Sequence, residues 1–126
     1  MKTKKITSHR DLEIYKIAFD AAMEIFELTK GFPKEEQYSL TDQIRRSSRS
    51  VCAQISEAFR KRKYEKSFIS KIVDGEGEAA ETQVWLEFSL RCGYIKKSKA
   101  NELYKIYDNI LSKFVIMRNQ PDKWVL

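Results

Sequence analysis

Apolar residues recur every three or four positions along nearly the whole chain of 126 residues, which is the spacing of one face of an α-helix. Short stretches at Gly31–Pro33, Arg60–Tyr64 and Gly93–Tyr94 interrupt this pattern. The predicted helices therefore cover about residues 9–30, 36–61, 65–92 and 98–119. Because long helices with short connections pack as antiparallel neighbours, the pattern predicts an all-α, single-domain, up-down-up-down four-helix bundle.

Several predicted helix ends carry residues that are typical of caps. Ser8 followed by Asp11 three positions later predicts a capping box at the start of the first helix. Gly93 suits the position just after the end of the third helix. Ser98 is the expected N-cap of the fourth helix, and Pro121 is expected to stop that helix.

Small and aromatic residues in the third helix and the tail predict contacts between helices. Gly75 and Gly77 each cost about 1 kcal/mol relative to alanine inside a helix, so the pair predicts a close helix contact or a local bend. Trp85 lies just off the apolar stripe and is expected at a seam between helices or subunits. Trp124 is expected to dock against the bundle or against a neighbour.

The second predicted helix has two different faces. One is apolar, with spacings of four and seven, and consists of Leu40, Ile44, Val51, Ile55 and Phe59. Arginines occupy the other side, namely Arg45, Arg49 and Arg60, with Arg46 beside them. A helix that only packs into a core does not need these arginines, so they indicate an anionic partner. The small residues between them indicate close contact with another helix.

Three alternatives remain open for the arginines in the middle of this helix. They could form a solvated surface, pair with acidic residues of a neighbouring subunit, or contact phosphates. The fork of an arginine binds carboxylates and phosphates bidentately, so the last two share one geometry. In the pairing alternative, Arg45, Arg46 and Arg49 would meet Glu76, Glu78 or Glu81 of a neighbour.

Four consecutive cations, Arg60 to Lys63, form a separate basic turn after the second helix. Tyr64 follows directly and could stack on a base. This cluster favours nucleic acid more than the face of the helix does. The candidate nucleic-acid-binding residues are therefore Arg45, Arg46, Arg49, Arg60, Lys61, Arg62 and Lys63.

Composition and charge are compatible with this hypothesis but do not establish it. Hydrophobic residues make up 42% and charged residues 33%, which is typical of one charge-rich globular domain. The net charge is +6, with basic ends and an acidic middle. Such a layout permits nucleic-acid binding, and it equally permits pairing between segments or subunits.

The residue types needed for enzyme chemistry are sparse. His9 is the only histidine, and its place at a helix start favours a capping or surface role. Cys52 and Cys92 are expected to be reduced and buried, and without nearby histidines they do not form a zinc site. We expect no catalytic activity, no metal and no cofactor. No apolar run is long enough for a membrane span, and the basic start lacks the apolar core of a secretory signal.

Three motifs follow one another in the order of a known family. They are RDLEIYKIA at 10–18, GFPKEEQYSLTDQIRRSSRSV at 31–51 and GEAAETQVWLEFSLRCGYI at 77–95. With them the chain resembles the four-helix-bundle proteins encoded in intervening sequences of bacterial 23S ribosomal RNA genes. That family is similar in turn to the accessory variability proteins of diversity-generating retroelements.

The resemblance implies a cytoplasmic bacterial protein without catalytic activity that forms a ring-shaped homo-oligomer, typically a pentamer. For the retroelement accessory proteins it implies a basic surface that binds nucleic acid and a reverse transcriptase. We therefore expect a non-enzymatic, oligomeric accessory protein that binds RNA or DNA through a basic face. The alternative is a protein-interaction scaffold whose basic and acidic faces pair between subunits, with no nucleic-acid role.

Overall fold

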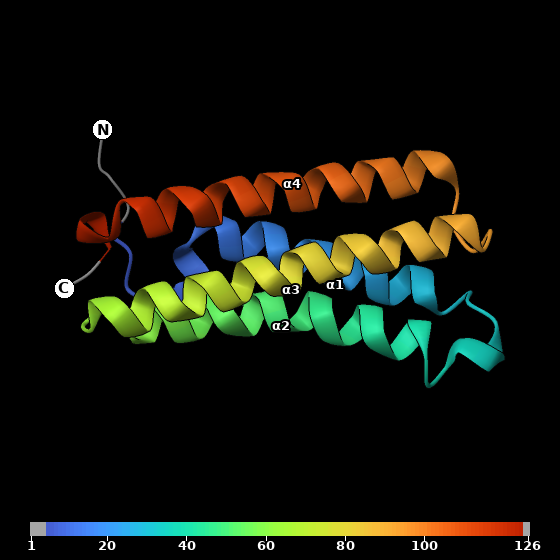
Figure 1. Cartoon of the computed structure of the whole chain (residues 1–126), viewed down its shortest axis with the longest axis horizontal. Helices are drawn as coiled ribbons and strands as arrows, with labels where there is room; N and C mark the ends of the chain where they lie inside the picture. The colour runs from blue at the N-terminus through green and yellow to red at the C-terminus, as the bar shows by residue number, and fades with distance from the viewer. Residues whose placement is uncertain (1–4, 125–126) are drawn as a thin grey trace.

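The computed structural model describes residues 5–124, and these form four long helices with no β-strand in that range. The long helices are α1 (Glu13–Thr29), α2 (Leu40–Arg60), α3 (Glu65–Arg91) and α4 (Lys97–Asn119). Three short 3-10 helices accompany them, η1 (His9–Asp11), η2 (Lys34–Glu36) and η3 (Pro121–Lys123). The predicted all-α, single-domain four-helix bundle is confirmed (Figure 1).

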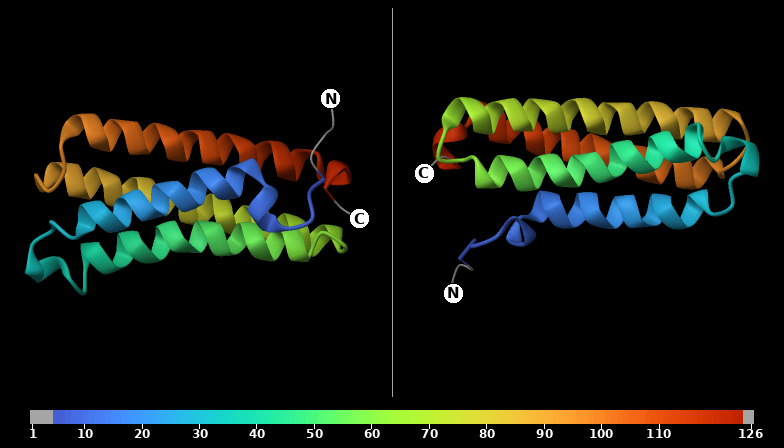
Figure 2. Two further views of the ribbon diagram at one scale, coloured as in Figure 1. Left: turned by 180° about the vertical axis from the view of Figure 1, so that it is seen from behind. Right: turned by 90° about the horizontal axis from the view of Figure 1, so that it is seen from below.

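Consecutive helices run in opposite directions and pack side by side, and α4 returns to lie beside α1 (Figure 1 and Figure 2). The α2–α3 pair has the most extensive contact, whereas α1 and α4 touch least among neighbours. α1 and α3 occupy opposite corners of the bundle. The α2–α3 turn, η1 and η3 lie together at one end of the bundle (Figure 1). Residues from three distant parts of the sequence therefore meet at this end.

One continuous apolar core fills the bundle, and all four helices contribute to it. The predicted stripe of α2 is buried except for Phe59, which is only partly buried and packs against the core. In α4, Tyr107 is fully buried, whereas Ile106 is only partly buried and packs against the core.

The first helix starts later than the apolar pattern predicts. The capping box at Ser8 and Asp11 is present, but it caps the short η1 rather than α1. The backbone at Leu12 is extended, with φ −74° and ψ 131°, and this separates η1 from α1. Leu12 is buried, so the interruption of the helix coincides with an apolar side chain that packs in the core.

The far end of the bundle also differs from expectation at two helix starts. α2 begins at Leu40 rather than near residue 36, because η2 and a turn precede it. The Glu36 carboxylate accepts hydrogen bonds from the Leu40 N–H at 3.3 Å and from the Tyr94 hydroxyl at 2.8 Å, which ties both connections together. The prediction of Ser98 as N-cap is wrong, because α4 begins at Lys97 with Lys96 as its cap.

The end of α3 follows the prediction. Gly93 adopts the left-handed conformation with φ +79°, which glycine reaches without a steric penalty. Its N–H donates to the Leu90 carbonyl, and the Tyr94 N–H donates to the Ser89 carbonyl, both at 2.9 Å. This is the hydrogen-bond pattern of a Schellman motif, which satisfies the last carbonyls of the helix.

Only one of the two glycines inside α3 makes a close helix contact. A Cβ atom at Gly75 would lie 2.6 Å from Cζ of Phe114, so α3 and α4 approach closely at this point. Phe114 is fully buried and has little room to move. At Gly77 an added Cβ meets nothing within 4 Å, and the residue is exposed.

We expect Gly75→Ala to lower the free energy of unfolding by about 1–2 kcal/mol, because overpacking outweighs the gain in helix propensity. The matched control, Gly77→Ala, should raise it by about 1 kcal/mol within the single bundle, because an added Cβ meets no other atom of the chain there. Urea denaturation at one protein concentration measures both. Equal effects of the two substitutions would contradict the close contact with Phe114. Relief of the loss by Phe114→Leu in the Gly75→Ala background would support that contact.

Candidate nucleic-acid interface

The basic turn, Arg60 to Lys63, connects α2 to α3 at the end of the bundle where η1 and η3 also lie (Figure 1). Hydrogen bonds from the Lys61 N–H to the Glu57 carbonyl at 2.9 Å and from the Tyr64 N–H to the Lys61 carbonyl at 2.9 Å close it. The backbone of the turn is therefore fixed by the ends of two helices. The side chains are attached to a rigid support rather than to a long loop.

Most cations of the basic turn point into solvent. Arg60, Lys61 and Lys63 are exposed, and within residues 5–124 none of the three side chains forms an ion pair or hydrogen bond. Arg62 is half-buried, and its guanidinium carbon lies 3.6 Å from the centre of the Phe59 ring. This contact places the Arg62 side chain across an aromatic ring at the edge of the core.

Tyr64 extends the same surface, and one further cation lies at the same end of the bundle. The Tyr64 side chain is 63% exposed, and the Lys63 ammonium lies 5.9 Å from the centre of its ring. Arg10 is exposed on η1, which packs beside α2. His9 makes this contact, since its Nδ1 lies 3.3 Å from the Ser56 hydroxyl and its ring packs edge-on against Tyr15. The single histidine thus has a packing role.

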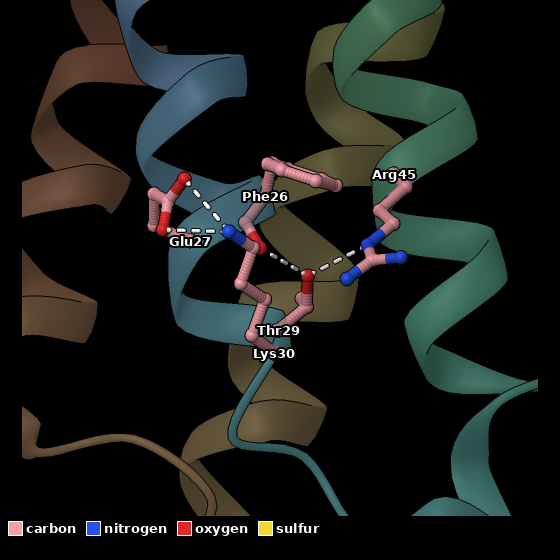
Figure 3. A network of polar contacts seen from close by, with 5 residues as sticks. All are labelled: Phe26, Glu27, Thr29, Lys30 and Arg45. Atoms are coloured by element: carbon pink, nitrogen blue, oxygen red, sulfur yellow. Dashed lines mark hydrogen bonds and ion pairs between the residues drawn. The ribbon is translucent and has the colours of Figure 1, made fainter.

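Arg45 does not belong to an open basic face. Its Nε donates to the Thr29 hydroxyl at 2.7 Å, and its guanidinium lies 4.8 Å from the centre of the Phe26 ring (Figure 3). Lys30 lies over the same ring and pairs with Glu27 at 3.1 Å. Arg45 therefore fastens α2 to the end of α1 within one chain, a role that none of the three alternatives included.

Arg46 and Arg49 are exposed and line a groove between α2 and α3, and the Arg49 guanidinium also lies 5.7 Å from the centre of the Phe26 ring on α1. The groove has a volume of about 510 Å³ and is also lined by Gln43, Ser50, Ala53, Glu78 and Glu81. Partial burial, together with the charge of Glu81, raises the pKa of Glu78, while a hydrogen bond from Ser50 and the charge of Arg46 act in the opposite direction. The basic side of α2 and the acidic side of α3 thus face each other inside one chain.

The third acidic residue of the pairing alternative is also engaged within the chain. Glu76 accepts a hydrogen bond from Nε of Arg118 at 2.7 Å. All three acidic residues therefore have basic neighbours in their own subunit. The structure brings Arg60 to Lys63 together, but it separates them from Arg49 by about 16 Å of helix. The seven predicted nucleic-acid-binding residues therefore form two separate groups on the surface and not one continuous site.

The outer face of α3 is apolar, which the sequence analysis did not single out. Five exposed residues at spacings of three and four form this face, namely Val73, Gly77, Ala80, Val84 and Phe88. The opposite side of α3 is buried in the core at Phe68, Ile72, Ala79 and Leu86. α3 therefore has two apolar faces, and only one of them is covered. In the sequence, the second face is indicated by these same five residues, which recur every three or four positions.

Two more exposed apolar residues lie on α1, at the opposite corner of the bundle. Phe19 and Met23 are 46% and 47% exposed and lie one turn apart. Trp85 packs partly against the core, with its ring 5.9 Å from that of Phe88, which fits the predicted seam position. Trp124 also packs against the core as expected. Val125 and Leu126 lie outside the described residues.

Both cysteines are free thiols. Cys52 is partly buried, and burial raises the pKa of its thiol to about 11. The prediction that Cys92 is buried is wrong, because it caps the exposed end of α3. Among residues 5–124, no three His, Cys, Asp or Glu side chains are grouped so that they could hold a metal ion. No helix there is long and apolar enough to cross a membrane.

Comparisons with known proteins place the chain in a family. No curated protein sequence matches it. Six chains of solved structures do. One is a protein of unknown function from the S23 ribosomal protein family of Bacteroides thetaiotaomicron. It is 26% identical, with a TM-score of 0.76 over 84% of this chain and 95% of its own. The profile of the 23S rRNA-intervening sequence proteins matches residues 10–115, which confirms the resemblance seen in the motifs. The chain belongs to the 23S rRNA-intervening sequence protein family.

Proposed function

We propose that this chain is a non-enzymatic, homo-oligomeric cytoplasmic protein that binds RNA or DNA through the basic turn. The observation that carries this proposal is the exposure of Arg60, Lys61 and Lys63 on a fixed turn, with no anionic partner in the described chain. Phosphate groups are the abundant cellular anions that match several closely spaced cations. Such contacts provide most of the affinity in sequence-independent binding.

The position of Lys63 argues against a purely structural role for the cluster. Arg60 and Lys61 lie at the end of α2, where a cation complements the negative end of the helix dipole. Lys63 lies just before α3, whose positive N-terminal end disfavours a nearby cation. A charge that does not help folding at its position is typical of a functional surface.

The start of α3 adds donors to the same surface. Tyr64 is the N-cap of α3, and its side chain makes no capping hydrogen bond. The first N–H groups of a helix lack partners within the helix, and together with the helix dipole they favour an anion. A phosphate at this turn would therefore meet both side-chain cations and backbone donors.

The two uncovered apolar faces support self-association. The outer face of α3 has small residues, Gly77 and Ala80, at its middle, whereas α1 presents the large Phe19 and Met23. These faces lie on opposite corners of the bundle, so contact between them in successive copies would be head-to-tail. Head-to-tail contacts generate closed rings when the rotation between copies closes. A pentamer is the ring size that the family resemblance implies.

The proposal is tested by fluorescence anisotropy with the purified wild-type protein and labelled RNA, single-stranded DNA and duplex DNA. We expect binding that weakens steeply as salt rises, with little dependence on sequence, because phosphate contacts do not read bases. Absence of binding at about 50 mM salt, where such contacts are strongest, would contradict the proposal.

The second candidate function is a scaffold without a nucleic-acid role. The uncovered outer face of α3 favours it, because an apolar helix face of this length needs a protein partner regardless of any nucleic acid. In this case the oligomer would be intact, and none of the three nucleic acids would bind. The same assay, combined with light scattering, therefore separates the two candidates.

A further inference from the structure

We infer that the basic turn takes unpaired nucleotides, with a base stacked on Tyr64 and its flanking phosphates held by the neighbouring cations. The inference rests on the proposed function and names the class of nucleic acid that the turn accepts. The turn combines flat side chains with charged ones on a fixed backbone. Positive charge alone would attract any nucleic acid, whereas the flat side chains can bind only bases that are unpaired.

Tyr64 presents an open ring on a fixed backbone. Its N–H donates to the Lys61 carbonyl, and its own carbonyl accepts from the Phe68 N–H, both at 2.9 Å. The ring is nevertheless 63% exposed, and no other ring packs against it among the described residues. A base could therefore stack on it and would displace at most the Lys63 ammonium, which lies 5.9 Å from the ring centre. Stacking on an aromatic side chain is the usual way in which proteins hold unpaired bases.

Arg62 provides a second flat group. Its guanidinium carbon lies 3.6 Å from the centre of the Phe59 ring, so one side of the guanidinium is held against an aromatic surface. This contact fixes the orientation of a long side chain before any ligand binds, which lowers the entropy cost of binding. Guanidinium planes also stack on unpaired bases, while their N–H groups reach phosphates.

The cations lie where the backbone of such a strand would run. Arg60, Lys61 and Lys63 are exposed on the same turn as the two flat groups, and the Lys63 ammonium lies 5.9 Å from the Tyr64 ring centre. A duplex would meet only these charges, because its bases are stacked on one another and cannot reach Tyr64. An unpaired strand can use both the charges and the rings.

The test compares Tyr64→Ala and Tyr64→Phe with the wild-type protein on an unstructured single strand of about 12 nucleotides and on the duplex of the same sequence. Anisotropy titrations over several salt concentrations give each affinity and its salt slope. Circular dichroism should show unchanged helix content, because the ring is exposed.

We expect the wild-type protein to prefer the single strand. Tyr64→Ala should weaken single-strand binding by about 5- to 150-fold, the equivalent of losing one stacked base. Tyr64→Phe should keep that affinity, duplex binding should not change, and the salt slope should stay the same because no charge is removed.

Equal binding of single strand and duplex, with no effect of Tyr64→Ala, would overturn this inference and leave the proposed function of the basic turn standing. An equal loss of affinity for both nucleic acids in Tyr64→Ala would also overturn it, because a stacked base is absent in the duplex. Failure of the wild-type protein to bind either nucleic acid would overturn the proposed function itself.

Discussion

Replacement of Arg60, Lys61, Arg62 and Lys63 by glutamine should lower the affinity for every nucleic acid and flatten the salt dependence of binding. Each neutralised phosphate releases condensed counterions and contributes about 0.7 to the slope of log K against log salt for a single strand. Four lost contacts should therefore reduce the slope by about 3. In the wild-type protein these contacts alone should make binding about fifty-fold weaker at 200 mM than at 50 mM salt.

A matched variant controls for the loss of charge. Arg91, Lys96, Lys97 and Lys105 are exposed residues on or near the α3–α4 connection, away from the basic turn. Their replacement by glutamine lowers the net charge from +6 by the same amount. This control should keep most of the affinity and most of the slope. Equal losses in the two variants would show that overall charge, and not the basic turn, is responsible for binding.

Ala80→Arg should convert the oligomer into single chains of 14.9 kDa. Ala80 lies at the middle of the outer face of α3, and in the proposed assembly this face is covered by a second copy. A cation buried there without a partner costs several kcal/mol, which is enough to dissociate most interfaces of modest size. The fold of each chain should persist, because the side chain is exposed in the single bundle.

Light scattering measures the mass of this variant and of a control, Asn109→Arg, which adds the same charge at an exposed position of α4. We expect the control to keep the oligomeric mass. An Ala80→Arg protein of unchanged mass would contradict the outer face of α3 as the contact surface. A wild-type protein that is a single chain at micromolar concentration would contradict self-association altogether.

The bundle was predictable because its information is local and periodic. The spacing of Ile44, Val51 and Ile55 predicts a helix without any knowledge of the helices that pack against it. Gly93 likewise predicts the end of α3 from its local conformational preference. Helix starts were less predictable. The break between η1 and α1 at Leu12 depends on the burial of the Leu12 side chain in the core. The local sequence does not show that burial.

The roles of the α2 arginines depend on tertiary contacts and were only partly predictable. The bond between Arg45 and Thr29 joins residues that are far apart in the sequence, and no local pattern reveals it. Pairing of Arg46 with the acidic residues of α3 was one of the three alternatives open from the sequence, and it was expected between neighbouring subunits. The structure places Glu78 and Arg46 in one groove of the same chain. The basic turn could be predicted from the sequence alone, because its four cations are consecutive residues.

The most direct test of the central claim is photochemical cross-linking of the wild-type protein to a single-stranded RNA that contains thiouridine. Cleavage after glutamate separates the two groups of candidate residues, because residues 58–65 contain the basic turn and residues 37–57 contain the α2 arginines. Mass spectrometry then identifies the peptide that carries the nucleotide. We predict that it is 58–65, and cross-links confined to 37–57 would contradict the assignment of nucleic-acid binding to the basic turn.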